Sequence, residues 1–106
     1  MNLKKILTFD DIVNRKDEKK INTKLDYNTE LLMITMEECG ELIEACSKTI
    51  RCEDYIDDAK MIEEVGDVLL MIDLIVDRGL VKKEDIDARK KVKLKKLKKW
   101  SNLINE

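Results

Sequence analysis

A short acidic motif occurs twice in this chain, and each copy lies among apolar residues that recur with the period of an α-helix. The first copy is EECGE at residues 37–41, and the second is EEVGD at residues 63–67, 26 residues later. Apolar residues around both copies recur at intervals of three and four, which predicts a helix at each. The chain must therefore place two acidic, glycine-containing helices in one small fold.

The ends of these two helices can be read from the sequence. Asp26 or Asn28 can cap the first helix, which is expected to end at about Arg51. The second helix is expected over about residues 58–78. Gly79 follows it at the position where a left-handed residue commonly ends a helix. The polar residues between the helices predict a turn.

Two further helices are predicted outside this pair. Thr8 and Asp11 form a capping box for a short helix to about Asp17, and a last helix is expected over about residues 82–102. The chain has no proline and three glycines, with 43% apolar and 42% charged residues. This composition favours long amphipathic helices over β-structure. We predict an all-α single domain over residues 1–106, an antiparallel helical hairpin with additional N- and C-terminal helices in a four-helix-type bundle.

The two motifs are expected to face each other. They are centred on Cys39 and Val65, and their midpoint is Cys52, at the predicted turn. If the helices fold back as an antiparallel hairpin, each centre lies 13 residues from the turn, or about 20 Å along a helix. Helix propensity alone does not require this match in height.

Four acidic residues of the motifs fall in the apolar stripes of their helices, where leucines normally lie. They are Glu38, Glu41, Glu64 and Asp67. Carboxylates placed together in a helix seam repel one another and lose hydration, and a bound divalent cation removes both penalties. An all-oxygen ligand set favours Mg²⁺ or Mn²⁺ over Zn²⁺. The motif glycines suggest close approach of a backbone or a ligand. The alternative is a solvated acidic face, which is the usual explanation of a lone EExxE.

Charge is unevenly distributed along the chain. Residues 27–78 carry four basic and fourteen acidic groups, whereas residues 79–106 carry ten basic and four acidic groups. No apolar run approaches the length of about 20 residues that a membrane span needs, and the basic N-terminus is too short in apolar residues for a signal peptide. The three cysteines, with no histidine, favour buried free thiols in a cytoplasmic protein over a zinc site. Cys39 and Cys46 share one helix face.

The pattern EExxE followed after 22 residues by ExxD resembles the signature of the MazG-like all-α nucleoside triphosphate pyrophosphohydrolases. That superfamily also includes dimeric dUTPases, dCTP pyrophosphatases and phosphoribosyl-ATP pyrophosphatase. The resemblance covers roughly residues 28–97, the core motif region. It implies a Mg²⁺-dependent hydrolase (Mn²⁺ is possible) that converts a nucleoside triphosphate to a monophosphate and pyrophosphate. It also implies control of a nucleotide pool and a homodimer or homotetramer.

The resemblance assigns roles to particular residues. Metal ligands are expected at Glu38, Glu41, Glu64 and Asp67, and catalytic residues at Glu37, Glu38 and Glu41. Glu37 would be a further ligand or would orient the attacking water, and the general base is left open. Substrate phosphates are expected to meet Lys48, Arg51 and Lys93. Many relatives have asparagine and glutamine where this chain has Lys91 and Glu30, so contacts to the base are not predicted.

The lysine-rich segment near the C-terminus is compatible with a second class of function, a non-enzymatic binding module. Residues 90–99 contain seven lysines, which could bind phosphodiester backbones in a nucleic-acid-binding or protein-assembly module. The acidic middle of the chain argues against nucleic acid as the partner. A third reading is a helical adaptor that has lost activity, and the presence of every acidic position argues against it. Trp100 and four methionines (Met33, Met36, Met61 and Met71) are expected to fill a core or an interface rather than a base pocket.

Overall fold

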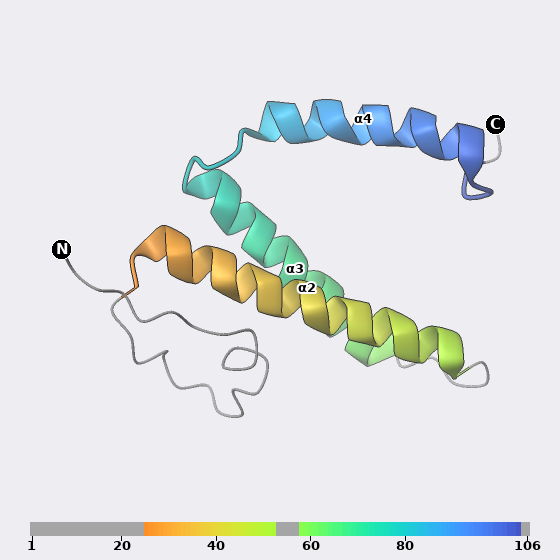
Figure 1. The fold of residues 1–106 in the computed structure, drawn as a ribbon, viewed down its shortest axis with the longest axis horizontal. Helices are drawn as coiled ribbons and strands as arrows, with labels where there is room; N and C mark the ends of the chain where they lie inside the picture. Colours follow the sequence, from red (N-terminus) through yellow and green to blue (C-terminus); the bar gives the residue numbers. More distant parts are fainter. Residues whose placement is uncertain (1–24, 53–57, 105–106) are drawn as a thin grey trace. The chain divides into compact units, whose positions relative to one another are not determined.

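The computed structural model describes residues 25–52 and 58–104, and within these ranges the chain is helical with no strand. The helices are α2 (Tyr27–Arg51), α3 (Asp58–Asp77) and α4 (Lys83–Trp100) (Figure 1). The all-α prediction is confirmed for these residues. The helix predicted near Thr8 lies outside them, so the four-helix-type bundle and its completion by oligomerisation stay predictions, as does the assignment of one domain to the whole chain.

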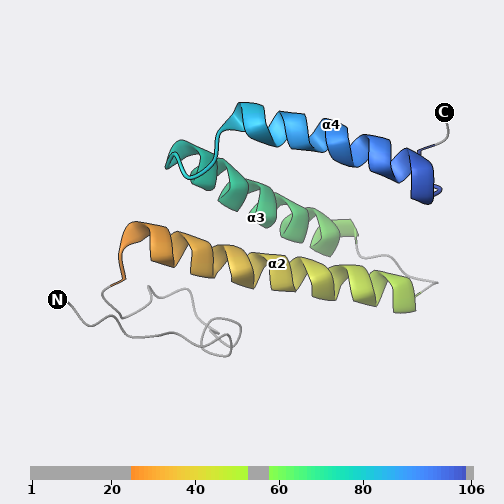
Figure 2. The same cartoon turned by 45° about the horizontal axis from the view of Figure 1, so that its top comes forward.

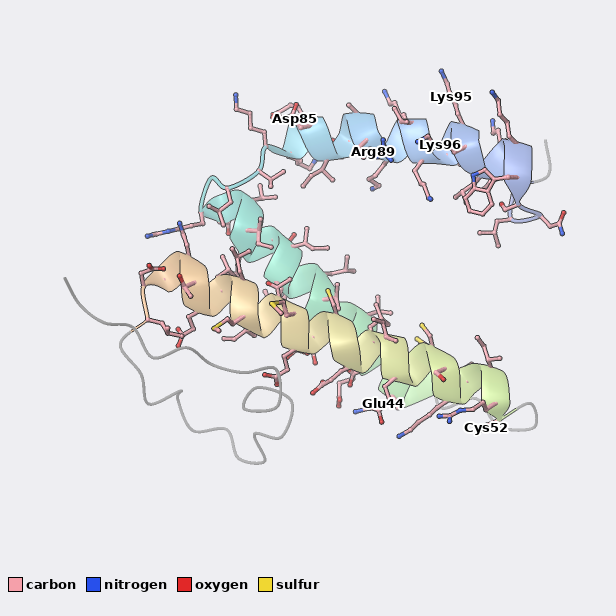
Figure 3. All side chains as sticks on the ribbon, in the orientation of Figure 1. Glu44, Cys52, Asp85, Arg89, Lys95 and Lys96 are labelled. Carbon is pink, nitrogen blue, oxygen red and sulfur yellow. The ribbon has the colours of Figure 1, made fainter. Side chains whose placement is uncertain are left out.

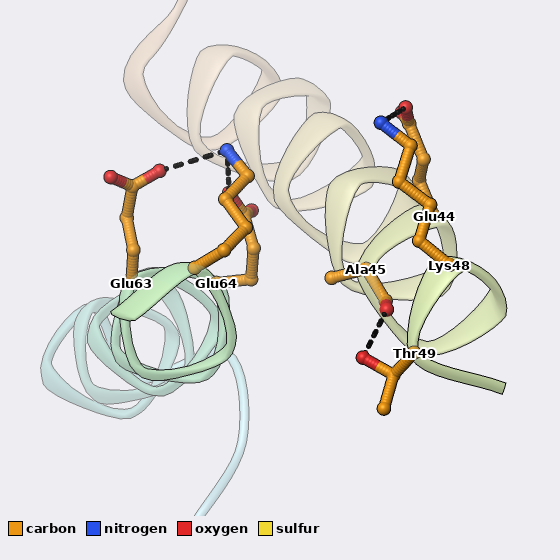
Figure 4. Close-up of polar contacts among 7 residues, drawn as sticks. Glu44, Ala45, Lys48, Thr49, Glu63 and Glu64 are labelled. Atoms are coloured by element: carbon orange, nitrogen blue, oxygen red, sulfur yellow. Dashed lines mark hydrogen bonds and ion pairs between the residues drawn. The ribbon is translucent and has the colours of Figure 1, made fainter. Parts of the chain in front are cut away.

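Helix α2 begins where a side chain caps its first turn. The carboxylate of Asp26 accepts a hydrogen bond of 2.8 Å from the backbone N–H of Thr29, so of the two candidate caps, Asp26 and Asn28, it is Asp26 that caps the helix. At the other end, the Cys52 N–H donates to the Lys48 carbonyl. Within the helix, the hydroxyl of the half-buried Thr49 donates to the carbonyl of Ala45, which satisfies a polar group in an otherwise apolar position (Figure 4).

Helices α2 and α3 run side by side in opposite directions as a hairpin (Figures 1 and 2). Along residues up to 74, their facing sides bury Leu31, Ala45 and Met71. Two carboxylates, Glu37 and Glu64, are buried with them. The predicted antiparallel hairpin is therefore present, and its interior contains charge as well as apolar side chains.

The side of α2 opposite the hairpin interior is apolar and exposed. Six residues occupy it at alternating intervals of four and three: Leu32, Met36, Cys39, Ile43, Cys46 and Ile50. We call these six residues the outer stripe. At about 100° per residue, this spacing places them along one line, away from Leu31 and Ala45. The thiols at positions 39 and 46 share a face as predicted, but the prediction that they are buried is wrong within a single chain, because the other face packs on α3.

The chain divides between Leu74 and Ile75 into two units, and the second contains the end of α3, a turn and α4. Gly79 has φ of 79°, its N–H donates to Val76, and the N–H of Leu80 donates to Ile75. This pair of bonds is the Schellman arrangement that a glycine permits, and it ends α3 as predicted.

Helix α4 has no buried residue, and its charged side chains leave the ribbon in several directions (Figure 3). Trp100, near its end, is 65% exposed, so it is no core residue within this unit. The ammonium of Lys93 lies 5.0 Å from the centre of its ring, a cation–π contact. Among the described helices, none is long and apolar enough to cross a membrane.

Candidate functional site

Four carboxylates meet between α2 and α3. Each of Glu38, Glu41, Glu64 and Asp67 offers an oxygen, and these four oxygens all lie within 4.8 Å of one another. Each helix contributes two acids three residues apart, a spacing that puts both on the same side of a helix. The predicted convergence of the two motifs is therefore observed. The roles assigned to these residues stay predictions.

The cluster is set into the hairpin rather than displayed on its surface. Glu64 is completely buried, and the neighbouring Glu37 is only 6% exposed. One carboxylate oxygen of the half-buried Glu38 has no contact with solvent and no hydrogen-bond partner among the described residues. Burying an ionised carboxylate without compensation is strongly unfavourable, so such a group signals a proton or a cation at this place.

Burial and mutual repulsion shift the acidity of the two α2 carboxyls. Burial, followed by the charges of Glu41, Asp67, Glu37 and Glu64, raises the pKa of Glu38 from 4.5 to about 7. Burial also raises the pKa of Glu41, with contributions from a hydrogen bond to Glu64 and from nearby negative charge. Near neutral pH the cluster therefore holds protons readily in the absence of a cation.

Lys60 is a site residue that the sequence analysis missed. Its ammonium lies 2.8 Å from Oε1 of the buried Glu64 and 3.1 Å from Oε2 of the exposed Glu63 (Figure 4). The hydrogen bonds to Glu64 and Glu63 raise the pKa of Lys60, so it is fully charged at neutral pH. The spacing of four residues to Glu64 could have revealed the pair, but ion pairs at this spacing are common on exposed helix surfaces.

A pocket of about 450 Å³ opens beside the cluster, towards the turn between the helices. Its lining includes Glu41 of the cluster, the apolar Ala45 and Met61, and the two ammonium groups of Lys48 and Lys60. The pocket is thus acidic where it meets the cluster, and beyond it the two lysines lie together with Glu44, the partner of Lys48. A ligand that carries a metal ion at one end and anionic groups next to it would match this arrangement.

The three predicted phosphate-binding residues are in different surroundings. Lys48 lines the pocket and pairs with Glu44 at 3.0 Å, which lowers the pKa of that carboxyl (Figure 4). Arg51 instead borders a separate hollow of about 490 Å³, together with Ile43 and Ile50 of the outer stripe. Lys93 belongs to the second unit, beside Trp100. Of the two residues on α2, only Lys48 lines the pocket.

The glycine of the second motif does not touch a neighbouring backbone. A Cβ built on Gly66 would have no atom within 4 Å among the described residues. Close approach of the two backbones, one of the two reasons expected for a mid-helix glycine, is therefore wrong at this position. Approach by a ligand or by another chain is compatible with the open space.

The donor set fits a hard divalent cation. All four converging groups are carboxylates, and neither a histidine nor a thiol is among them. Oxygen-only sets of this kind suit Mg²⁺, Mn²⁺ or Ca²⁺, whereas Zn²⁺ sites usually include nitrogen or sulfur. A cation would also satisfy the buried oxygen of Glu38 and relieve the repulsion that raises the pKa of two carboxyls.

Comparison with known proteins agrees with this chemistry. A family model described as the MazG nucleotide pyrophosphohydrolase domain matches residues 27–100. No curated protein and no solved structure matches the chain. The matched region includes all three described helices and both acidic motifs, and it is well over half of the 106 residues. Members of the family are hydrolases of nucleotides, and the acidic cluster can hold the metal ion that such hydrolases use. The chain belongs to the MazG nucleotide pyrophosphohydrolase family.

Proposed function

We propose that this protein is a Mg²⁺-dependent nucleoside triphosphate pyrophosphohydrolase. The reaction is (d)NTP plus water to (d)NMP plus pyrophosphate, with Mn²⁺ as a possible substitute metal. The observation that supports it most is the meeting of four carboxylates, one of them completely buried, where two helices would otherwise bury leucines. A structural role would not explain why a small hairpin core contains this much negative charge. Limiting or cleaning a nucleotide pool would be its biological task.

The proposed ligands are Glu38, Glu41, Glu64 and Asp67. The bound ion would supply charge neutralisation at the phosphate oxygens and a lower pKa for the attacking water. The carboxylate of Glu37 is buried beside these ligands, and its charge acts on both Glu38 and Glu41. We assign it the orientation of the water that attacks the α-phosphorus, because a buried carboxylate next to the ligands can accept a hydrogen bond from that water.

The remaining phosphate charge needs cations. Lys48 lines the pocket next to Glu41 and is the best placed of the predicted phosphate-binding residues. Arg51 and Lys93 would meet the substrate's phosphates in the assembled enzyme. An interface built on the outer stripe would place a second chain beside Arg51, because this arginine borders the same hollow as three residues of the stripe.

The outer stripe supports a homodimer or homotetramer. Its residues Ile43 and Ile50 are 70% and 76% exposed, and the stripe continues along almost the whole of α2 without a charged residue. Apolar residues at alternating spacings of three and four form the seam by which helices pair. A second copy of this chain offers an identical seam, so the two can bury each other's stripe about a two-fold axis.

The experiment that tests the reaction is pyrophosphate release from a panel of (d)NTPs with Mg²⁺. The wild type is expected to release pyrophosphate and the matching monophosphate. Glu38→Gln and Asp67→Asn are each expected to reduce kcat by roughly 100-fold or more, the scale on which electrostatic groups at a reacting phosphate act. Asp73→Asn is the matched control, because Asp73 is an exposed α3 carboxylate six residues beyond Asp67.

The same panel can contradict the proposal. If the wild type releases no pyrophosphate from any nucleotide with Mg²⁺ or Mn²⁺, the enzymatic function is wrong. Salt-dependent binding of DNA and RNA would then test the alternative, a non-enzymatic helical module that uses the basic α4. If the wild type is active but Asp73→Asn is as damaging as Asp67→Asn, the metal site has been assigned to the wrong carboxylates.

A further inference from the structure

Lys60 brings a positive charge directly to the buried part of the acidic cluster. Its ammonium lies 2.8 Å from Oε1 of Glu64, which has no exposed surface, and it also contacts Glu63. The side chain of Lys60 itself is 52% exposed. The lysine therefore reaches from the solvent-facing edge of α3 to a carboxylate inside the hairpin, and it can withdraw without disturbing buried packing.

The position of Lys60 is shared between the cluster and the pocket. It lines the pocket with Lys48 and Met61, while its charge acts on both Glu41 and Glu44. A lysine side chain is a flexible four-carbon chain that ends in a compact charge, and such a chain can exchange partners over a few ångströms. Both possible positions of the ammonium, at Glu64 and in the pocket, are thus within reach of the same backbone site.

We propose that Lys60 is the resident counter-cation of the metal centre, which pairs with Glu64 in the metal-free enzyme and turns to the substrate's phosphates when the metal is bound. The inference rests on the proposed function, because it takes Glu64 as a metal ligand. The new element is that Lys60 changes its partner, from Glu64 in the metal-free state to the substrate's phosphates in the metal-bound state.

Charge balance gives the reason for the exchange. In the metal-free state, the ammonium of Lys60 lies 2.8 Å from one of the four converging carboxylates, that of Glu64, so it offsets part of the cost of burying this group. A divalent ion at the same carboxylates would repel that ammonium at short range. The pocket beside the cluster is the open space that Lys60 already lines, and a phosphate oxygen there would provide the charge that Glu64 no longer gives.

The first test is a Mn²⁺ titration in the absence of nucleotide, followed by electron paramagnetic resonance or calorimetry. Lys60→Met removes the competing charge and keeps the length of the side chain. Its affinity for Mn²⁺ is expected to rise by roughly tenfold, as one unit charge at close range permits in a partly solvated site. Lys48→Met is the matched control, since Lys48 lines the same pocket but pairs with Glu44, which is not a proposed ligand. Its Mn²⁺ affinity is expected to change much less.

The second test measures binding of a triphosphate with a non-hydrolysable α,β-methylene bridge at saturating Mn²⁺. Lys60→Met is expected to bind it several-fold more weakly than the wild type, whereas Lys60→Arg should keep most of the affinity. The combination of tighter metal binding and weaker nucleotide binding is the signature of the exchange. Structural damage to the hairpin would weaken both.

Each outcome separates this inference from the proposed reaction. If Lys60→Met binds Mn²⁺ no more tightly than the wild type, or binds the nucleotide equally well, the exchange is wrong even if hydrolysis is observed. If the expected pair of changes occurs in a protein that hydrolyses no nucleotide, the exchange stands and the proposed reaction fails. If the wild type binds no Mn²⁺, both are overturned.

Discussion

The acidic hairpin of α2 and α3 and the basic helix α4 are both highly charged, but they place their charges differently. The hairpin buries Glu37 and Glu64 beside a small apolar core, and it has an apolar stripe on its exposed side. Helix α4 buries none of its residues, and its lysines lie in solvent (Figure 3). The hairpin thus inverts the usual arrangement, whereas α4 follows it.

This difference shows which charges carry functional information. A solvated lysine on α4 loses little on folding, so its presence is compatible with solubility alone. A carboxylate with no exposed surface destabilises the fold unless a proton, a lysine or a metal ion compensates it, so its presence needs a ligand or a partner as explanation. The exposed apolar stripe of α2 also calls for an explanation, because a contiguous apolar surface in contact with water is unfavourable and commonly marks an interface.

The largest expected effect comes from placing charge in the outer stripe. Ile43→Lys should convert the proposed dimer or tetramer to a monomer, because a lysine in the centre of a helix seam cannot be desolvated without a counter-charge. Ile43 is 70% exposed in the single chain, so the substitution should leave the helices of the monomer intact. Light scattering coupled to size-exclusion chromatography measures the mass, and circular dichroism checks the helix content.

Ile43→Leu is the matched control for this test, because it keeps an apolar side chain of equal size at the seam. It should retain the mass of the wild type. If the wild-type protein is monomeric at the concentrations of the activity assay, the proposed interface is wrong. The outer stripe would then be exposed apolar surface without a partner.

The next effect concerns the pH dependence of stability without metal. The pKa of Glu38 is raised from 4.5 to about 7 in the folded protein, so the folded state binds more protons than the unfolded state between these values. The free energy of unfolding should therefore decrease as pH rises through this range. In EDTA-treated protein we expect Tm to fall by about 5 °C between pH 5.5 and pH 8, the size of shift that about 1 kcal/mol gives in a domain of this length. Mg²⁺ should restore Tm at pH 8.

Two variants identify the group responsible. Glu38→Gln should reduce the pH dependence of the metal-free protein, because its amide does not titrate, while Glu41, whose pKa is also raised, should keep part of it. Glu44→Gln is the control: Glu44 is an exposed carboxyl of the same helix, and the ion pair with Lys48 lowers its pKa, so it cannot produce a loss of stability with rising pH. Equal slopes for the wild type and Glu38→Gln would exclude Glu38 as the cause.

Much of this arrangement could be predicted from the sequence, because the helical spacing of the acidic residues and the equal distance of the two motifs from the turn agree. Helical spacing placed Glu38 and Glu64 on the apolar sides of their helices, and the equal distance of the motifs from the turn placed them at one height. The cap at Asp26 and the end of α3 at Gly79 follow from local hydrogen bonding, which sequence encodes directly. These features depend on residues close in the chain or on one simple fold-back.

The sequence did not predict which face of each helix packs against its neighbour and which face stays exposed. Cys39 and Cys46 were predicted to be buried and are exposed, because α2 is apolar on two opposite sides and only packing on α3 decides which side is covered. Lys60 was missed because it lies outside both acidic motifs, and a lysine four residues before a glutamate is common on exposed helix surfaces. Burial is a property of the assembled hairpin, so periodicity alone could not supply it.

The smallest expected effect tests the lysines of α4. The family resemblance predicted that Lys93 meets a substrate phosphate, and its ammonium lies over the Trp100 ring. If it meets a substrate phosphate in the assembled enzyme, Lys93→Met should raise KM by about threefold to tenfold with little change in kcat, as loss of uniform binding does. Lys95→Met removes an equal charge from another exposed position of the same helix and should leave KM unchanged. If KM is unchanged in both variants, Lys93 does not contact the substrate. If KM rises equally in both and depends steeply on salt, α4 attracts the nucleotide through its overall positive charge instead of through a contact by Lys93.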